Sequence, residues 1–133
     1  TKFFSKSSIK SLTILSDDNI TLDNSAYEDC KKLEVVKLHS TNHIEIFEFC
    51  FCNAINLISL EIFGKYVFAG KSCFENCKSI EYLSIPNSYK VEFAQNAFLG
   101  CKNIVQIEII SLQEFKAGDC CFSNESKIRF FLQ

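Results

Sequence analysis

One segment of this chain recurs along its whole length, and that recurrence limits the folds open to it. Residues 72–88, SCFENCKSIEYLSIPNS, contain a small residue, an aromatic residue, two polar residues and a cysteine, followed by apolar residues at Ile80, Leu83 and Ile85. The position of Cys73 recurs at spacings of 24, 24, 23, 24 and 24 residues, and all but the first of these positions hold a small residue. These reference positions are Lys2, Ala26, Cys50, Cys73, Ala97 and Cys121. A repeat of this length predicts a solenoid, in which each coil packs only against its neighbours.

An aromatic residue follows every reference position. These residues are Phe3, Tyr27, Phe51, Phe74, Phe98 and Phe122. Three residues further on, the middle repeats carry Cys30, Ala54, Cys77 and Cys101, whereas the outer two carry Lys6 and Glu125. A spacing of three between the aromatic residue and the cysteine is typical of one helical turn. Each repeat is therefore predicted to begin with a short helical turn that buries both side chains.

Apolar residues at strand spacing complete each repeat. In chain order, the predicted inward-facing sets are Ile9, Leu12, Ile14; Leu33, Val36, Leu38; Leu57, Leu60, Ile62; Ile80, Leu83, Ile85; Ile104, Ile107, Ile109; and Ile128, Phe131, Gln133. A second apolar pair precedes each later reference position, from Ile20 and Leu22 to Phe115 and Ala117, so both broad sides of a coil should be buried. Turn-forming residues follow the strands at 17–19, 40–42, 64–65 and 86–88, where we expect the chain to turn.

Composition narrows the function classes. An apolar content of 47% excludes a disordered chain, and 14 basic against 16 acidic residues leave no basic surface for nucleic acid. No apolar run approaches the roughly 20 residues that span a bilayer, so membrane insertion is not expected. We expect residues 1–133 to form a single solenoid. Because the chain lacks methionine and begins at Thr1, we also expect it to be part of a longer polypeptide.

The recurring pattern resembles a known family. The motif [A/C]-[F/Y]-x-x-C-x-x-[L/I]-x-x-[L/I]-x-I, with Ile-Pro-Asn-Ser in the fourth repeat, is similar to the BspA-like leucine-rich repeats and covers essentially the whole chain. The resemblance implies a β-dominated α/β-type solenoid of about six repeats, with a parallel sheet on its concave side and short helical turns. It also implies a binding or adhesion protein that is secreted or lies at the cell surface. Two features depart from the family: most repeats carry one residue more than its usual 23, and proline occurs only at Pro86.

The eight cysteines admit more than one interpretation. Six lie in the two inward columns, where they are explained as small buried apolar residues, which would fit a reducing cytoplasm. Adjacent coils lie about 4.8 Å apart, close enough for disulfides between Cys77 and Cys101 or between Cys50 and Cys73. Only Cys52 and Cys120 lie outside the columns and are candidates for reactive thiols.

No metal, cofactor or catalytic site is predicted. The best zinc candidate is Cys50 and Cys52 near His39 and His43, but paired knuckles are lacking and the two histidines are expected in one turn without a fixed partner. No motif of a hydrolase, a nucleotide-binding protein or a metalloprotease occurs. We therefore predict a protein that is not an enzyme.

The outward positions of the concave strands are the candidate protein-binding residues, because a rigid exposed sheet leaves their side chains free to vary. They are Val35, Lys37, His39, Ser59, Glu61, Phe63, Tyr82, Ser84, Gln106, Glu108 and Ile110. With Pro86, the apolar members would form a stripe flanked by Lys37, Glu61 and Glu108, as in a protein interface; scattered exposed apolar residues are the alternative. The predicted function is binding of a protein partner through this face. The alternative is a structural component of a larger assembly or cell-surface coat, and end-to-end association through uncapped terminal coils is a further expectation.

Overall fold

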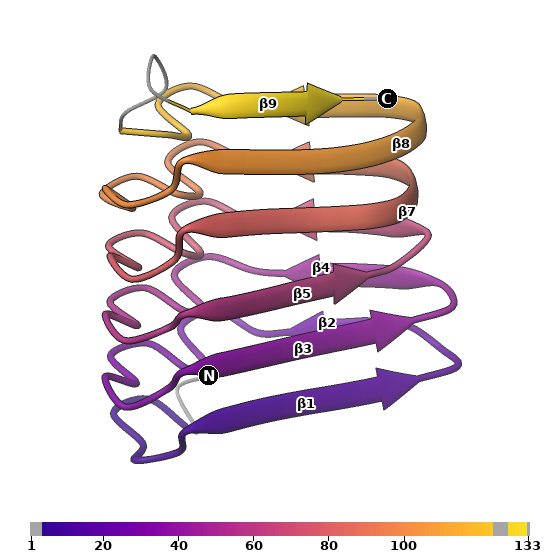
Figure 1. Cartoon of the computed structure of the whole chain (residues 1–133). Coiled ribbons are helices and arrows are strands. Elements are labelled where there is room, and N and C mark those ends of the chain that lie inside the picture. The colour runs from indigo at the N-terminus through magenta and orange to yellow at the C-terminus, as the bar shows by residue number, and fades with distance from the viewer. Residues whose placement is uncertain (1–3, 124–127, 133) are drawn as a thin grey trace.

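The chain folds as a stack of flat coils made of parallel strands (Figure 1). The structure, a computed structural model, describes residues 4–123 and 128–132. Its strands are β1 (Ser11–Ser16), β2 (Ile20–Leu22), β3 (Val35–Ser40), β4 (His43–Ile46), β5 (Ser59–Phe63), β6 (Tyr66–Ala69), β7 (Tyr82–Phe93), β8 (Gln106–Ala117) and β9 (Arg129–Leu132). The predicted β-dominated solenoid with a parallel sheet is confirmed.

Each coil contributes to two parallel layers. The front layer pairs β1, β3, β5, the first half of β7, the first half of β8, and β9, whereas the back layer pairs β2, β4, β6 and the second halves of β7 and β8. β7 and β8 run from one layer into the other without a break, so a single hydrogen-bonded sheet wraps around the core. The front layer corresponds to the sheet expected on the concave side. The back layer was expected only as a buried stretch and is also a parallel sheet.

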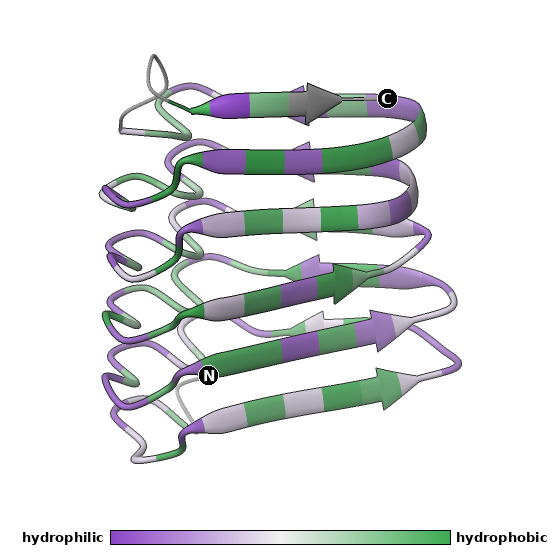
Figure 2. Ribbon diagram, in the orientation of Figure 1, coloured by the Kyte–Doolittle hydropathy of each residue, from purple (hydrophilic) through white to green (hydrophobic). Residues whose placement is uncertain are grey.

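The core lies between the two layers. The strands alternate between buried and accessible residues, and Figure 2 shows the same alternation of apolar and polar positions along the front strands. The inner coils seal it completely: Leu38, Ile62 and Ile85 of the front layer and Ile44 of the back layer are all 0% exposed. The predicted inward columns are therefore confirmed for the inner coils.

A stack of aromatic rings runs through the turn side of the core. Neighbouring rings of Tyr27, Phe51, Phe74 and Phe98 lie 5.1–5.2 Å apart and within 7° of parallel. Phe122 extends the stack at 5.6 Å from Phe98. Because every coil repeats the same turn, each ring is placed directly over the ring of the preceding coil.

The two outer repeats correct the predicted register. Phe4, not Phe3, stacks on Tyr27, with ring centroids 5.2 Å apart, and Phe3 lies outside the described residues. In the last repeat Phe130 pairs with Ile107 and packs against the core, although Phe131 had been assigned to that inward position. In both outer repeats, one residue fewer than in the inner repeats separates the stacked aromatic residue from the inward-facing strand residue. The spacing of the reference positions alone does not reveal this difference.

The predicted helical turns are not found in the described residues, where successive hydrogen-bonded turns take their place. In the fourth repeat the amide of Cys77 donates to the carbonyl of Phe74 within its own turn, whereas the amides of Phe74 and Asn76 donate to the next coil. Residues with positive φ, such as Ser72 at 55° and Asn76 at 63°, separate these turns. The amides of Phe74 and Asn76 are thus committed to the next coil, so pairing between coils takes the place of a helical hydrogen-bond ladder here.

The corners between the layers differ from coil to coil. Pro86–Ser88 had been predicted to end its strand, yet β7 continues through them with shifts in register on either side of Ser88. Ser88 is buried, and its hydroxyl donates to the carbonyl of Gly64 at 2.7 Å, which accommodates the bend within the sheet. The third coil has the shortest corner: Val67 follows Ile62 by five residues, whereas the equivalent residues of the other coils are six apart.

Candidate protein-binding face

The structure brings the predicted binding residues onto one face of the front layer. They lie at the accessible positions of β3, β5, β7 and β8, alternating with the buried core residues. Each is exposed or half-buried, and Tyr82 is 58% exposed. The parallel register therefore places residues from four coils side by side on a common surface, which we call the front face.

Three rows of side chains cross the front face along the stack. The first row contains Val35, Ser59, Tyr82 and Gln106; the middle row contains Lys37, Glu61, Ser84 and Glu108; the third contains His39, Phe63 and Ile110. The charged residues thus run between the apolar ones instead of flanking them. The front face has no continuous apolar stripe, because the polar middle row separates Val35 and Tyr82 from Phe63 and Ile110.

A compact cluster joins two of these rows. Nε2 of His39 lies 2.5 Å from Oε2 of Glu61, and the His39 ring packs edge-on against Phe63 with centroids 4.4 Å apart. The expectation of a histidine without a fixed partner is therefore wrong for His39. It is wrong for His43 too, which begins β4 and packs against Tyr66 at 4.6 Å. Contacts on two sides hold His39 in place on the front face.

A hollow lies beside the third row, where the corner of the third coil is short. Its volume is about 540 Å³. Its lining residues are Ser40, Thr41, Phe63, Gly64, Lys65, Asn87, Ser88, Tyr89, Ile110 and Leu112. Glycine is required at Gly64, because a Cβ there would lie 2.9 Å from Cδ1 of the buried Ile44. We call this site the corner hollow; it shares Phe63 and Ile110 with the front face.

Sequence reasoning missed the remaining residues of the corner hollow, notably Lys65, Tyr89 and Leu112. The signal was present in the single spacing of 23 residues between the reference positions Cys50 and Cys73. The missing residue falls at Gly64–Lys65, so this corner is recessed between the longer corners of the neighbouring coils. A one-residue change in a repeat therefore marks the place where the surface is hollowed.

Most of the cysteines are buried. All eight lie among the described residues and none forms a disulfide, and the six in the two inward columns are buried. The thiols of Cys77 and Cys101 donate to the carbonyls of Phe51 and Phe74 in the preceding coil at 3.3 and 3.0 Å. A cysteine at this position thus fills a small apolar space and adds a second hydrogen bond to a carbonyl that already accepts a backbone amide.

One of the two candidate reactive thiols is buried. Cys52 is only 6% exposed, and burial together with nearby acidic residues raises its pKa to about 12. The prediction of a reactive thiol at Cys52 is therefore wrong, because a buried thiol is inaccessible to reagents and its raised pKa disfavours the thiolate. Cys120 is exposed. Within the described ranges, no three histidine, cysteine or acidic side chains converge as metal ligands.

The comparison with protein families agrees with the repeat architecture of the structure. None of the segments described by the structure forms a helix of the length and apolar character needed to cross a membrane. No curated protein and no solved structure matches the chain. The family model of the BspA type leucine rich repeat region matches residues 1–129 in six copies. The chain therefore belongs to the BspA-type leucine-rich repeat family.

Proposed function

We propose that this protein is a non-enzymatic module that binds a protein partner through the front face. Repeat regions of this family generally serve protein interaction and adhesion. The observation that carries the proposal is the arrangement of Tyr82, Lys37 and Glu61 on one rigid parallel sheet. An exposed aromatic side chain beside charged groups is typical of the residues that dominate binding at protein interfaces.

The sheet fixes these side chains before a partner arrives. Lys37 lies opposite Glu61, and Glu61 opposite Ser84, in a continuous register anchored by buried residues on the core side. Preorganised side chains lose little conformational entropy on binding, which increases affinity for a given contact area. The front face is therefore suited to recognition of a partner whose surface offers matching charges around an apolar contact for Tyr82.

The test inverts the charge pattern of the front face while preserving the fold. The variant combines Lys37→Glu, Glu61→Lys and Tyr82→Ala; the exchange keeps opposite charges on facing strands, so the sheet should remain paired. Partners are captured from the native source on immobilised protein and identified by mass spectrometry. We expect the variant to lose the captured protein and to keep its circular dichroism spectrum.

A matched control reverses charges away from the front face. The control combines Lys71→Glu with Glu48→Lys. Both residues are exposed and lie in turns outside the front-face strands, and the exchange leaves the net charge unchanged. This control should retain capture. Equal capture by the front-face variant and the control would refute the front face as the binding surface and would favour a structural role in an assembly.

A further inference from the structure

The lining of the corner hollow combines apolar side chains with a single charged one. Phe63, Tyr89, Ile110 and Leu112 supply an apolar lining, and Lys65 is the one charged residue among the lining residues, all of which the structure describes. Leu112 is 84% exposed and Tyr89 36%, so much apolar surface here remains in contact with water. Ser40, Thr41, Asn87 and Ser88 add neutral polar groups, and a hollow of this size that combines exposed apolar surface with polar groups is typical of a binding site.

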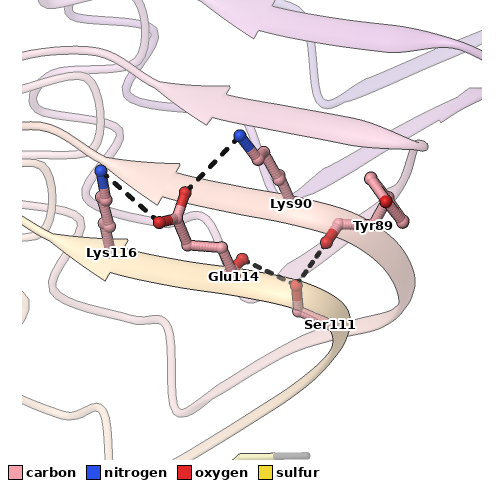
Figure 3. A network of polar contacts seen from close by, with 5 residues as sticks. All are labelled: Tyr89, Lys90, Ser111, Glu114 and Lys116. Carbon is pink, nitrogen blue, oxygen red and sulfur yellow. Dashed lines mark hydrogen bonds and ion pairs between the residues drawn. The ribbon is translucent and has the colours of Figure 1, made fainter.

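The wall of the corner hollow is held in place by a polar network (Figure 3). The hydroxyl of Ser111 lies 2.9 Å from the carbonyl oxygen of Tyr89 and 2.7 Å from that of Glu114, which ties β8 to β7 at their corners. The Tyr89 ring also packs edge-on against Tyr66 at 5.7 Å. The corner hollow is thus a preformed feature of the fold and not a gap between free loops.

The lysines near the corner hollow differ in whether a carboxylate lies within ion-pair distance. Lys90 and Lys116 both pair with Glu114, at 3.7 and 3.5 Å (Figure 3). Lys65 is exposed, and among the described residues no carboxylate lies within ion-pair distance of it. Its ammonium group lies 5.7 Å from the centre of the ring of Tyr66, which is not a lining residue, whereas Lys65 itself lines the corner hollow. The site therefore offers an apolar cavity bordered by one unneutralised cation.

We propose that the corner hollow receives a segment of the protein partner in which an apolar side chain is followed by an acidic one. The apolar side chain enters between Phe63, Ile110 and Leu112, and the carboxylate meets Lys65. This inference rests on the proposed function, since it names the chemistry of the partner at the side of the front face. The absence of any carboxylate among the lining residues favours an anionic segment over a cationic one.

The test titrates short peptides into the isotope-labelled protein and follows backbone amide shifts by NMR. The probes are N-acetylated, C-amidated Gly-Phe-Asp-Gly, Gly-Phe-Lys-Gly and Gly-Ala-Asp-Gly. We expect the Phe-Asp peptide to shift the amides of Gly64, Lys65 and Tyr89 and to bind about two- to five-fold more tightly than the Phe-Lys peptide, as an exposed ion pair allows. The Ala-Asp peptide should produce the weakest shifts.

Paired variants separate the two halves of the site. Lys65→Gln should abolish the preference for aspartate, whereas Lys32→Gln, an exposed lysine outside the lining, should retain it. Leu112→Ser should weaken binding of both phenylalanine peptides, whereas Ile58→Ser, also an exposed apolar residue, should not. Shifts centred elsewhere, no shifts at all, or an unchanged preference in Lys65→Gln would each overturn the inference.

The outcome is distinguishable from a failure of the proposed function. Tyr82 lies outside the corner hollow, so Tyr82→Ala should bind the Phe-Asp peptide as the parent protein does. Loss of peptide binding with intact partner capture refutes only the occupant of the corner hollow. Peptide binding without any effect of the front-face variant on capture refutes only the proposed front-face function.

Discussion

Replacing Gly100 with alanine tests two requirements of a single turn position. Gly100 has a φ of 80°, and a Cβ there would lie 2.2 Å from Oδ1 of Asn76. The same turn position carries Asn76 and Asn53 in the preceding coils, each with positive φ. Nδ2 of Asn76 donates to Oδ1 of Asn53 at 3.0 Å, and Nδ2 of Asn53 donates to Oδ1 of Asp29 at 2.7 Å. This side-chain ladder ends at Gly100, where the Asn76 amide occupies the space of a side chain.

The expected loss has two parts. A left-handed alanine is disfavoured by about 1–2 kcal/mol. Moving the Asn76 amide aside removes its hydrogen bond, which contributes about 1 kcal/mol to stability. Gly100→Ala should therefore lower the free energy of unfolding by about 2–3 kcal/mol. In an Asn76→Gly background, which keeps the positive φ and removes the obstructing amide, only the backbone part of about 1–2 kcal/mol should remain.

Urea denaturation of the parent, the two single variants and the double variant measures this coupling. Circular dichroism and tyrosine fluorescence should give coincident transitions with equal slopes before the free energies are compared. A control background is Asn56→Ala, which removes a hydrogen bond to the carbonyl of Lys31 on a different turn position; here the loss from Gly100→Ala should be unchanged. An equal loss in the Asn76→Gly background would refute the steric reasoning.

Three further predictions concern the core and the thiols. Phe74→Ala removes a ring stacked between Phe51 and Phe98 and should lower the free energy of unfolding in urea titrations by about 3–5 kcal/mol. Phe4→Ala should have a much smaller effect, because the Phe4 side chain is 51% exposed. Equal losses in the two variants would contradict the internal stack. Native protein should react with a maleimide only at Cys120, so Cys120→Ser should abolish labelling until urea is added, and fast labelling of Cys52 would be inconsistent with its burial. Burial raises the pKa of the Cys50 thiol from 9.0 to about 12. The native state therefore holds the thiol proton more tightly than the unfolded state does. The contribution of this proton to the free energy of unfolding is complete below pH 9 and declines between pH 9 and about 12. Urea titrations between pH 7.5 and 10.5 should therefore show falling stability, by up to about 1.4 kcal/mol per pH unit for each such thiol, and a shallower fall in Cys50→Ala, while a pH-independent stability would contradict this linkage.

The sequence was sufficient to predict the solenoid because its signals repeat. The columns of Phe51, Phe74 and Phe98, and of Leu38, Ile62 and Ile85, indicate the same arrangement independently in successive coils, so the inner register and the outward residues of the front face followed directly. The helical turns were predicted wrongly because local spacing does not reveal that alternate amides bond to the next coil. The strand through Pro86 was missed for a related reason: its pairing with β8 is a contact between coils.

The one deviation in repeat length lies beside the corner hollow. Regular coils produce a regular surface, and the front face shows this by spreading its apolar residues over separate rows. The corner hollow exists because one residue is missing between Ile62 and Val67, which recesses Gly64 and leaves Phe63, Tyr89 and Leu112 around an open space. If this reasoning is correct, inserting one glycine between Gly64 and Lys65 should restore the usual corner length and fill the corner hollow. That insertion should leave the aromatic stack and the front-face rows intact and abolish peptide binding, so it separates the effect of corner length from that of any single side chain.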